Sequence, residues 1–337
     1  MHNKKLTFNI IYIPGTVNYQ AIPLISLLLN SDFNFKLIGN GLNESERNML
    51  KQISSVSDRL EYINIESKNI IPHGTLLDLM FLSESESLYC FCDSDLFLFD
   101  EIKTDFIKEK MEKHQVLSSG GRIENESDSI YAGFKGGATT KSPDGRIDLA
   151  TSFFCVYNRE FLQSTIDQYG VGFEQYRLDL QIPKHASSVI NKMNLEYEMF
   201  DTGKLLSILM HDMGGEKYFT EFTGLVHIGG MSGRYLQDLD INKKVIINDD
   251  LNISSSNKVT EYNIRNDYEI SLKKLYGKYF YCYLNHLIGK GPEPLLNSSN
   301  QRVQDTVKRL AKSISKIVEE GKQREDTLSI FNIISSK

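Results

Sequence analysis

The sequence lacks any apolar run long enough to cross a lipid bilayer, which takes about 20 consecutive residues. Its first residues, Met-His-Asn-Lys-Lys, lead directly into a strand-like stretch. They contain neither the uninterrupted apolar h-region nor the small-residue cleavage site of a signal peptide. We therefore expect no transmembrane segment, no signal peptide and a cytoplasmic location.

An excess of basic residues is also missing. The 337 residues include 38 Lys and Arg against 44 Asp and Glu, for a net charge of −6. Nucleic-acid-binding proteins usually carry a basic face, so we expect no nucleic-acid partner. The hydrophobic fraction of 40% and charged fraction of 24% are typical of a folded globular protein. This length suits one large α/β domain with an appendage, or two ordinary domains.

Cysteine is scarce, with four residues in the chain. Cys90 and Cys92 alternate along a strand-like stretch, which places them on the same face, and their spacing is not the C-x-x-C of redox or zinc sites. We expect buried, reduced thiols.

Two nucleotide-binding motifs are absent as well. No G-x-G-x-x-G follows the first strand-like stretch, and no G-x-x-x-x-G-K-[ST] occurs anywhere. Both absences disfavour a dinucleotide-dependent dehydrogenase and a P-loop enzyme.

What the sequence does contain is an alternation of strand-like and helix-like stretches in its first part. Runs rich in β-branched and aromatic residues predict strands, and longer apolar-periodic runs predict helices. The predicted strands are 8–14, 33–38, 60–65, 88–92, 115–119, 150–157 and 222–226, and the predicted helices are 21–30, 43–54, 74–83, 203–210, 268–288 and 301–320. The alternation predicts an α/β fold with a mostly parallel, Rossmann-like sheet flanked by helices.

Two carboxylates, Asp93 and Asp95, follow the fourth predicted strand, at the edge of the sheet where such folds bind ligands. An Asp-x-Asp motif alone means little, because about one is expected by chance in a chain of this length and Asp238-Leu-Asp240 is a second. The first pair, however, lies between Leu-Tyr-Cys-Phe-Cys and Leu-Phe-Leu-Phe. Carboxylates so close to a buried sheet are costly without a compensating cation or hydrogen bonds. Mg²⁺ or Mn²⁺ fits this pair, and a turn or N-cap pair is the alternative.

Glycine-rich backbone follows His227, in the segment His-Ile-Gly-Gly-Met-Ser-Gly233. Imidazole is a common ligand of transition metals, and glycines allow the main chain to approach a ligand closely. A lone histidine is more often structural, but its combination with the Asp pair points to a shared metal site.

A strand-borne Asp-x-Asp after three βα units, followed far downstream by His-x-x-Gly, resembles the nucleotide-sugar glycosyltransferases of the GT-A fold. The resemblance covers about residues 7–235. It implies that Asp93 and Asp95 coordinate a metal bound to the donor diphosphate, that His227 completes the coordination, and that Gly230 is the glycine of the late motif. The pattern is similar to those of families 8 and 2. In family 8 a diphosphate-contacting lysine follows, whereas this chain has Gly233 and then Arg234, which could serve the same end.

The resemblance also implies a donor site and a base. The fold usually binds the nucleotide near the end of the first strand, which makes Pro14, Gly15, Thr16 and Val17 candidates for the nucleotide contacts. The implied cofactors are Mn²⁺ or Mg²⁺ and a nucleotide-sugar donor, with a UDP-sugar as the first candidate. The acceptor is open between a glycan, a small molecule and a protein.

Asp201 is a candidate general base on the acceptor hydroxyl, because inverting members of the fold place an acidic residue between the two motifs. The competing interpretation is helix capping, since Asp201 precedes an apolar helix-like run and Asp is a favoured N-cap. His211 and Asp212 have a weaker claim, as the polar end of that run.

The expected domain organisation has two parts. Residues 1–240 form the glycosyltransferase domain, with a donor half at about 1–120 and an acceptor half at about 121–240, and residues 241–337 form a mostly helical extension. A Gly-, Ser- and Asp-rich stretch at 118–148 is either a lid over the site or an idle surface loop. The apolar residues of the last helix form one stripe, which either packs on the body or forms a homodimer seam, with Gly321 expected as the C-cap. The stripe residues are Val303, Val307, Leu310, Ile314 and Ile317.

The sequence thus predicts a metal-dependent glycosyltransferase. A nucleotidyltransferase of similar fold and a non-catalytic binding protein that retains the fold are the alternatives.

Overall fold

The computed structural model describes residues 4–67, 69–118, 121–122, 140–141, 147–150, 153–177, 181–195, 199–219, 224–233, 236, 238–248, 257–260 and 263–336. Arg234 and most of the 118–148 stretch lie outside the described residues. The interpretation of that stretch as a lid therefore remains a prediction.

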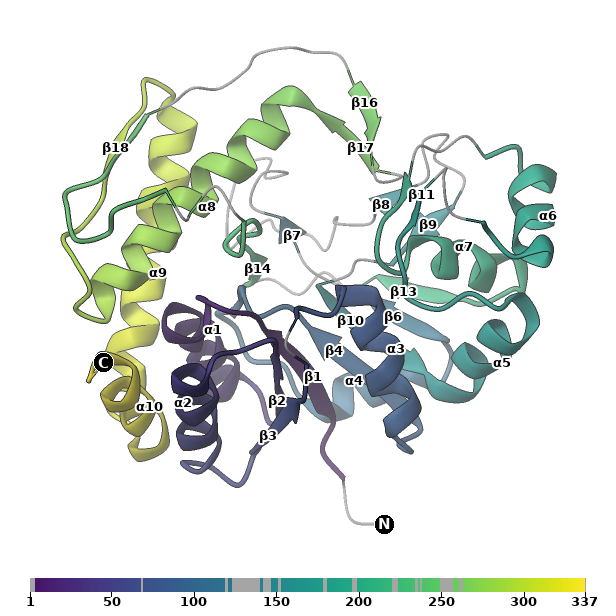
Figure 1. Cartoon of the computed structure of the whole chain (residues 1–337), viewed down its shortest axis with the longest axis horizontal. Helices are drawn as coiled ribbons and strands as arrows, with labels where there is room; N and C mark the ends of the chain where they lie inside the picture. Colours follow the sequence, from purple (N-terminus) through teal and green to yellow (C-terminus); the bar gives the residue numbers. More distant parts are fainter. Residues whose placement is uncertain are drawn as a thin grey trace.

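A seven-stranded mixed sheet forms the centre of the molecule (Figure 1). Every strand of it runs parallel to its neighbours except β10, which is antiparallel to both β4 and β6. The predicted α/β architecture with a mostly parallel sheet is confirmed. In spatial order the strands are β13 (Lys217–Phe219), β6 (Val116–Ser118), β10 (Phe154–Asn158), β4 (Leu88–Cys92), β1 (Thr7–Tyr12), β2 (Asn34–Asn40) and β3 (Leu60–Ile65).

Helices cover both faces of this sheet, because its central strands carry apolar residues on each face. One face, which includes Cys90 and Cys92, packs against α1 (Val17–Asn30), α2 (Glu44–Ser54) and α4 (Thr104–Met111). The other, which includes Tyr89 and Phe91, packs against α3 (His73–Ser83), α5 (Arg159–Tyr169) and α7 (Lys204–Asp212). All four cysteines are buried and free, as the sequence predicts.

The C-terminal helices pack on the outer side of α1 and α2. They are α8 (Asp267–Leu287), α9 (Gln301–Gly321) and α10 (Glu325–Ser335), and their buried residues share one apolar cluster with the first sheet face. Figure 1 shows them at one side of the molecule and α5, α6 (Lys184–Lys192) and α7 at the other. None of the helices, so far as the structure describes them, is both long and apolar enough to span a membrane.

The predicted stripe of α9 lies inside this cluster. Val303, Val307, Leu310, Ile314 and Ile317 are all buried against the body of the same chain. The stripe is therefore not a surface for a homodimer seam, and the packing alternative is correct.

Shorter strands form small additional sheets. A three-stranded sheet, β5 (Leu96–Leu98), β14 (Leu225–His227) and β7 (Gly121–Arg122), adjoins the carboxyl end of β4. The described residues also contain four two-stranded ribbons. These pair β11 (Tyr176–Arg177) with β12 (Met199–Phe200), β15 (Ile246–Asn248) with β18 (Leu295–Asn297), β16 (Asn257–Thr260) with β17 (Asn263–Asn266), and β8 (Thr140–Lys141) with β9 (Asp148–Leu149).

The predicted start of the first helix was wrong. The first helix begins at Val17, four residues before the prediction, so Pro23 lies in its second turn and not in its first. The polar residues Asn18 and Gln20 obscured this start in the sequence. In the structure the main-chain amide of Gln20 donates to the carbonyl of Thr16 at 3.1 Å. By contrast, the second helix begins where the sequence predicts, because Asn43 caps α2 and forms a capping box with Glu46.

Candidate metal centre

The strand order places the candidate site at a topological switch point. From β1 the chain runs through α1, β2 and α2 to β3 on one side, and then crosses by α3 to β4 on the other side of β1. Strands β1 and β4 are hydrogen-bonded neighbours, and the next strands of this sheet along the chain, β2 after β1 and β6 after β4, lie on opposite sides of the pair. Open α/β sheets bind ligands at the carboxyl ends of such a strand pair. Asp93 comes directly after β4, and the segment 14–17 comes after β1.

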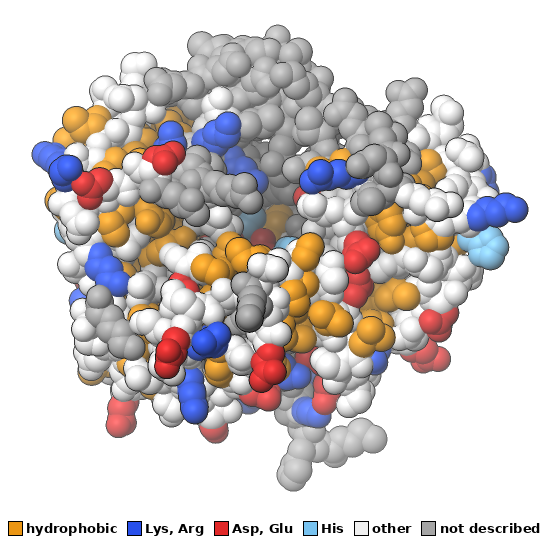
Figure 2. Space-filling model, viewed as in Figure 1, with side chains coloured by type: hydrophobic (Ala, Val, Ile, Leu, Met, Phe, Trp, Pro, Cys, Tyr) orange, Lys and Arg blue, Asp and Glu red, His pale blue; other side chains and the backbone are white. Residues whose placement is uncertain are grey.

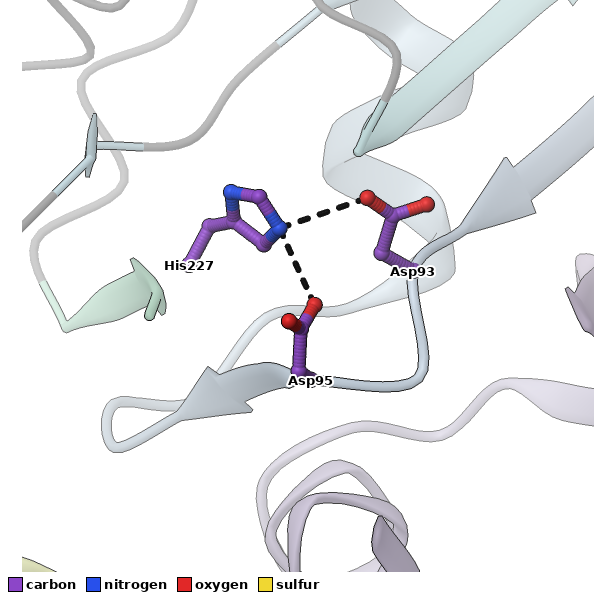
Figure 3. Close-up of side chains that lie close together, drawn as sticks. All are labelled: Asp93, Asp95 and His227. Carbon is purple, nitrogen blue, oxygen red and sulfur yellow. Dashed lines mark ion pairs between the residues drawn. The ribbon is translucent and has the colours of Figure 1, made fainter. Parts of the chain in front are cut away.

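A tight turn joins β4 to β5 and presents both aspartates. The Asp93 amide donates to the carbonyl of Phe153 at 3.0 Å, and the Leu96 amide donates to the carbonyl of Asp93 at 3.3 Å. Between the aspartates, the Ser94 hydroxyl donates to Oε1 of the buried Gln20 on α1 at 2.7 Å. Ser94 therefore holds the turn against α1, while Asp93 and Asp95 project together (Figure 3).

Strand β14 brings His227 to this turn from more than 130 residues downstream in the sequence. It pairs antiparallel with β5, and His227 is the register partner of Leu96. The His227 Nε2 atom lies 3.0 Å from Asp95 Oδ1 and 3.3 Å from Asp93 Oδ2 (Figure 3). The predicted convergence of Asp93, Asp95 and His227 is confirmed.

Phe153 supports this cluster and was missed by the sequence reasoning. Its ring stacks on the imidazole of His227, with centroids 4.4 Å apart and planes at 9°. Its carbonyl accepts the hydrogen bond from the Asp93 amide. One residue thus fixes the ring plane of His227 and the main chain of Asp93. Its sequence signal, an aromatic residue in an apolar run, indicates only a core position.

The loop after His227 wraps around Asp95. The Ile228 amide donates to the carbonyl of Asp95 at 3.4 Å, and the Met231 amide donates to its carboxylate. Gly229 and Gly230 between them have φ values of 71° and 69°, a left-handed conformation that other residues adopt at a cost. The glycines therefore serve to turn the chain back over the Asp95 carboxylate.

Charge decides the protonation of the cluster. Burial on its own would lower the pKa of His227, but the charges of Asp95 and Asp93 and their hydrogen bonds raise it to about 9. Burial would likewise raise the pKa of Asp95, yet the charge and hydrogen bond of His227, together with the charge of Lys273, hold it below its usual value. The side chains of Asp95 and His227 are only 8% and 12% exposed. Two carboxylates in such a place require a positive partner, either the proton on His227 or a metal ion.

The donor set fits a divalent metal. One atom from each of Asp93, Asp95 and His227 can be chosen so that all three lie within 4.8 Å of one another. In an octahedral Mg²⁺ site with bonds of about 2.1 Å, neighbouring ligand atoms are about 3.0 Å apart, so small side-chain rotations suffice. Two carboxylates and one imidazole suit Mg²⁺ and especially Mn²⁺, which accepts nitrogen as well as oxygen.

The residues proposed for nucleotide contacts lie at the same end of the sheet. Pro14 and Gly15 are exposed there, whereas Thr16 and Val17 are buried in the start of α1. The Thr16 hydroxyl donates to the carbonyl of Ile13 at 2.8 Å, and the Gly15 amide donates to Glu46 on α2 at 2.5 Å. Only Pro14 and Gly15 therefore present a surface to a ligand in this conformation.

Asp201 does not cap α7. The N-cap position is Gly203, and no side chain accepts a hydrogen bond there. The Asp201 carboxylate instead accepts from the Thr202 amide at 2.8 Å and from Gln175 at 2.5 Å. Asp212 accepts from Tyr169 and Lys192, which assigns it a structural role at the end of α7.

The second Asp-x-Asp motif is a surface turn. Asp240 is exposed, pairs with Lys243 at 3.0 Å and accepts from the Asn242 amide at 3.2 Å. The motif has the same spacing as Asp93 and Asp95, but it lies outside the sheet, and among the described residues the Asp240 carboxylate meets only its sequence neighbours Asn242 and Lys243.

No protein-family model matches the chain, and no curated protein matches its sequence. Solved structures are similar to it at low identity. The mannosyltransferase PcManGT from Pyrobaculum calidifontis, in complex with GDP-Man and Mn²⁺, is 9% identical over 99% of this chain and 87% of its own, with a TM-score of 0.42. The glycosyltransferase GlyE of Streptococcus pneumoniae TIGR4 is 13% identical over 64% of this chain and 45% of its own, with a TM-score of 0.37.

A third similar structure is S. aureus TarS 1–349 in complex with UDP-GlcNAc. It is 16% identical over 49% of this chain and 48% of its own, with a TM-score of 0.33. The match spans less than half the length of GlyE and of TarS. Similarities this low assign neither an activity nor a substrate to this chain by themselves.

Proposed function

We propose that this protein is a metal-dependent glycosyltransferase that moves a sugar from a nucleoside diphosphate sugar to an acceptor. The observation that carries the proposal is the cluster of Asp93, Asp95 and His227 at the switch point between β1 and β4. It combines the ligand chemistry of Mn²⁺ or Mg²⁺ with the position where α/β sheets bind nucleotides.

Asp93, Asp95 and His227 would hold the metal. When bound, such an ion acts as a Lewis acid and stabilises the negative charge of a nucleoside diphosphate leaving group. Phe153 keeps the imidazole in plane, and the hydrogen bonds of the 93–96 turn and of the Met231 amide keep the carboxylates in place. A rigid set of ligands reduces the reorganisation that the reaction requires.

The remaining roles are part of the same proposal. Pro14 and Gly15, the exposed part of the segment from Pro14 to Val17, would border the nucleotide, and the main chain at Gly230 would approach the donor. Asp201 would act as base on the acceptor hydroxyl, and Arg234 would add positive charge near the diphosphate. UDP- and GDP-sugars, the kinds of ligand bound to TarS and PcManGT, are the first donors to test.

The test compares Asp95→Asn with wild type. The change keeps the size of the side chain and removes its charge, so we expect metal-dependent donor turnover to fall about 100-fold or more. Asp240→Asn is the matched control, because it makes the same change in the exposed second Asp-x-Asp and should leave turnover unaltered. Release of nucleoside diphosphate from UDP- and GDP-sugars is measured with Mn²⁺, and again after chelation.

The measured product separates the alternatives. Nucleoside diphosphate release that needs metal and Asp95 supports the proposal, whereas pyrophosphate release from nucleoside triphosphates would indicate a nucleotidyltransferase. Turnover that persists in Asp95→Asn and under chelation contradicts the proposal.

A further inference from the structure

Helix α8, in the C-terminal segment, reaches the metal centre from outside the sheet. It packs on α1, where Tyr281 makes an edge-on contact with Tyr19 at 5.0 Å between centroids. The hydroxyl of Tyr19 in turn donates to the carbonyl of Met231, in the loop that wraps Asp95. The start of α1, the loop after His227 and α8 are thus connected by direct contacts.

Lys273 is the residue of α8 that lies beside this loop. A methyl group placed on Gly229 would lie 3.5 Å from Lys273 Cε and 3.4 Å from His227 Cε1. Both side-chain atoms therefore lie close to one point above the Gly229 α-carbon. The absence of a side chain at Gly229 leaves the lysine stem room to pass next to the imidazole.

The ammonium group of Lys273 has no structural partner among the described residues. Within the described ranges it forms no ion pair and no hydrogen bond, and the side chain is half-buried. Its charge nevertheless acts on the centre, because it contributes to holding the pKa of Asp95 down. A half-buried ammonium group that acts on Asp95, and that has no ion pair of its own among the described residues, has donors left for an anionic ligand.

Formal charge indicates which anion. The charge of a divalent ion bound by Asp93, Asp95 and a neutral His227 is formally cancelled by the two carboxylates, so the centre has no net charge to add to the metal's coordination of a ligand. Lys273 adds one positive charge at its edge. Lysine is a flexible point charge with three donors, which suits phosphate oxygens. The face of the molecule drawn in Figure 2 is hollowed near its centre, with acidic and histidine side chains visible inside the hollow and basic side chains at its rim.

We propose that Lys273 binds the diphosphate of the nucleotide donor, so that the C-terminal segment supplies part of the donor site. This inference rests on the proposed function, because it assumes that the metal centre receives a nucleoside diphosphate. It assigns to α8 a binding role that its place outside the sheet domain gave no reason to expect.

The test measures binding, with Mn²⁺ alone and then with UDP or GDP at saturating Mn²⁺, by titration calorimetry. In Lys273→Met, which keeps the apolar stem, we expect Mn²⁺ affinity within about 3-fold of wild type and nucleoside diphosphate affinity reduced about 10-fold or more. Lys273→Arg should restore part of the loss. The matched control is Lys274→Met, since Lys274 is exposed and lines a separate cavity with Ile246 and Ile247.

The outcomes distinguish the two proposals. If wild type binds UDP or GDP at saturating Mn²⁺ and Lys273→Met binds the same nucleotide equally well, the role of Lys273 is disproved and the proposed function stands. If wild type binds neither nucleotide in the presence of Mn²⁺, both the proposed function and this inference are disproved. Thermal unfolding of Lys273→Met at the wild-type temperature excludes a folding defect as the cause of lost binding.

Discussion

Among the described carboxylates, Asp95 and Asp78 are both withdrawn from solvent but have pKa values shifted in opposite directions. Asp95 has His227 and Lys273 near it, and its pKa is lowered in spite of burial. Asp78 on α3 is half-buried and has no such cation among the described residues. Desolvation, with a smaller contribution from the charge of Glu174, raises the pKa of Asp78 to about 6, opposed by the hydrogen bond from the Phe173 amide at 2.9 Å. The charges and hydrogen bonds of neighbouring groups, more than the depth of burial, decide the protonation state of each carboxyl group.

Asp78 gives a prediction on pH and stability. A folded-state pKa of about 6 against an ordinary 3.8 means that folding favours the protonated acid. Its contribution to stability is complete below pH 3.8 and is lost as the pH rises through about 6. Asp78→Asn stays neutral and keeps an oxygen for the Phe173 amide. We therefore expect it to gain about 1 kcal/mol of unfolding free energy over wild type between pH 4 and pH 7, after allowance for solvent screening.

Denaturant unfolding at pH 4, 5.5 and 7 provides the measurement. Asp238→Asn is the control, because Asp238 is exposed and its replacement makes the same chemical change outside the protein interior. An Asp78→Asn difference that is flat across this range would show that Asp78 is already ionised in the folded state at low pH.

At the scale of elements, the end of α9 shows how packing overrides a local signal. Gly321 was expected as a left-handed C-cap, but the helix includes it and ends at Lys322 with right-handed geometry. A methyl group on Gly321 would lie 2.8 Å from Ile25 on α1 and 3.0 Å from the ring of Phe331 on α10. Glycine is needed there for the close approach of three helices, and not for a turn.

Gly321→Ala separates these two explanations. Helix propensity alone would make alanine more stabilising by about 1 kcal/mol, whereas overpacking costs about 1–3 kcal/mol. Because the neighbours are a buried isoleucine and a buried ring, we expect net destabilisation of about 1 kcal/mol. Chemical denaturation measures it, with Lys312→Ala on the exposed face of α9 as a control that should change little. A stabilised Gly321→Ala protein would mean that α10 can move aside.

At the scale of the whole molecule, residues 241–337 are not a loosely attached extension. The buried residues of α8, α9 and α10 continue the apolar cluster that covers one face of the sheet through α1. The sequence boundary at 240 remains a prediction about function, but the packing makes the C-terminal helices part of the core that supports the metal centre.

Leu310→Ala tests this packing. Leu310 is fully buried on α9, so the change should cost about 2–5 kcal/mol of unfolding free energy. The oligomeric state should be the same as that of wild type, because the residue faces its own chain. Unfolding at two protein concentrations and light scattering are the measurements, with exposed Glu319→Ala as the control. A mild loss of stability combined with a change in association would indicate that the α9 stripe belongs to an interface between chains.

The sequence by itself determined the alternation of elements and the first half of the site. Periodicity and composition are local properties, so 60–65 and 88–92 were predicted with the bounds that the structure has, and the apolar surroundings of Asp93 and Asp95 distinguished them from Asp238 and Asp240. The pairing with His227 was predicted from an order of motifs that resembles that of the GT-A glycosyltransferases.

The tertiary structure decided the contacts between residues distant in sequence. Phe153 on the His227 ring, Lys273 beside Gly229 and the helix contacts at Gly321 depend on how strands pair and helices pack, and no short segment encodes them. An aromatic in a strand or a lysine on a helix has the same local signal whether it lines a site or not. Only the long-range β5–β14 pairing and the docking of α8 on α1 give these side chains their roles.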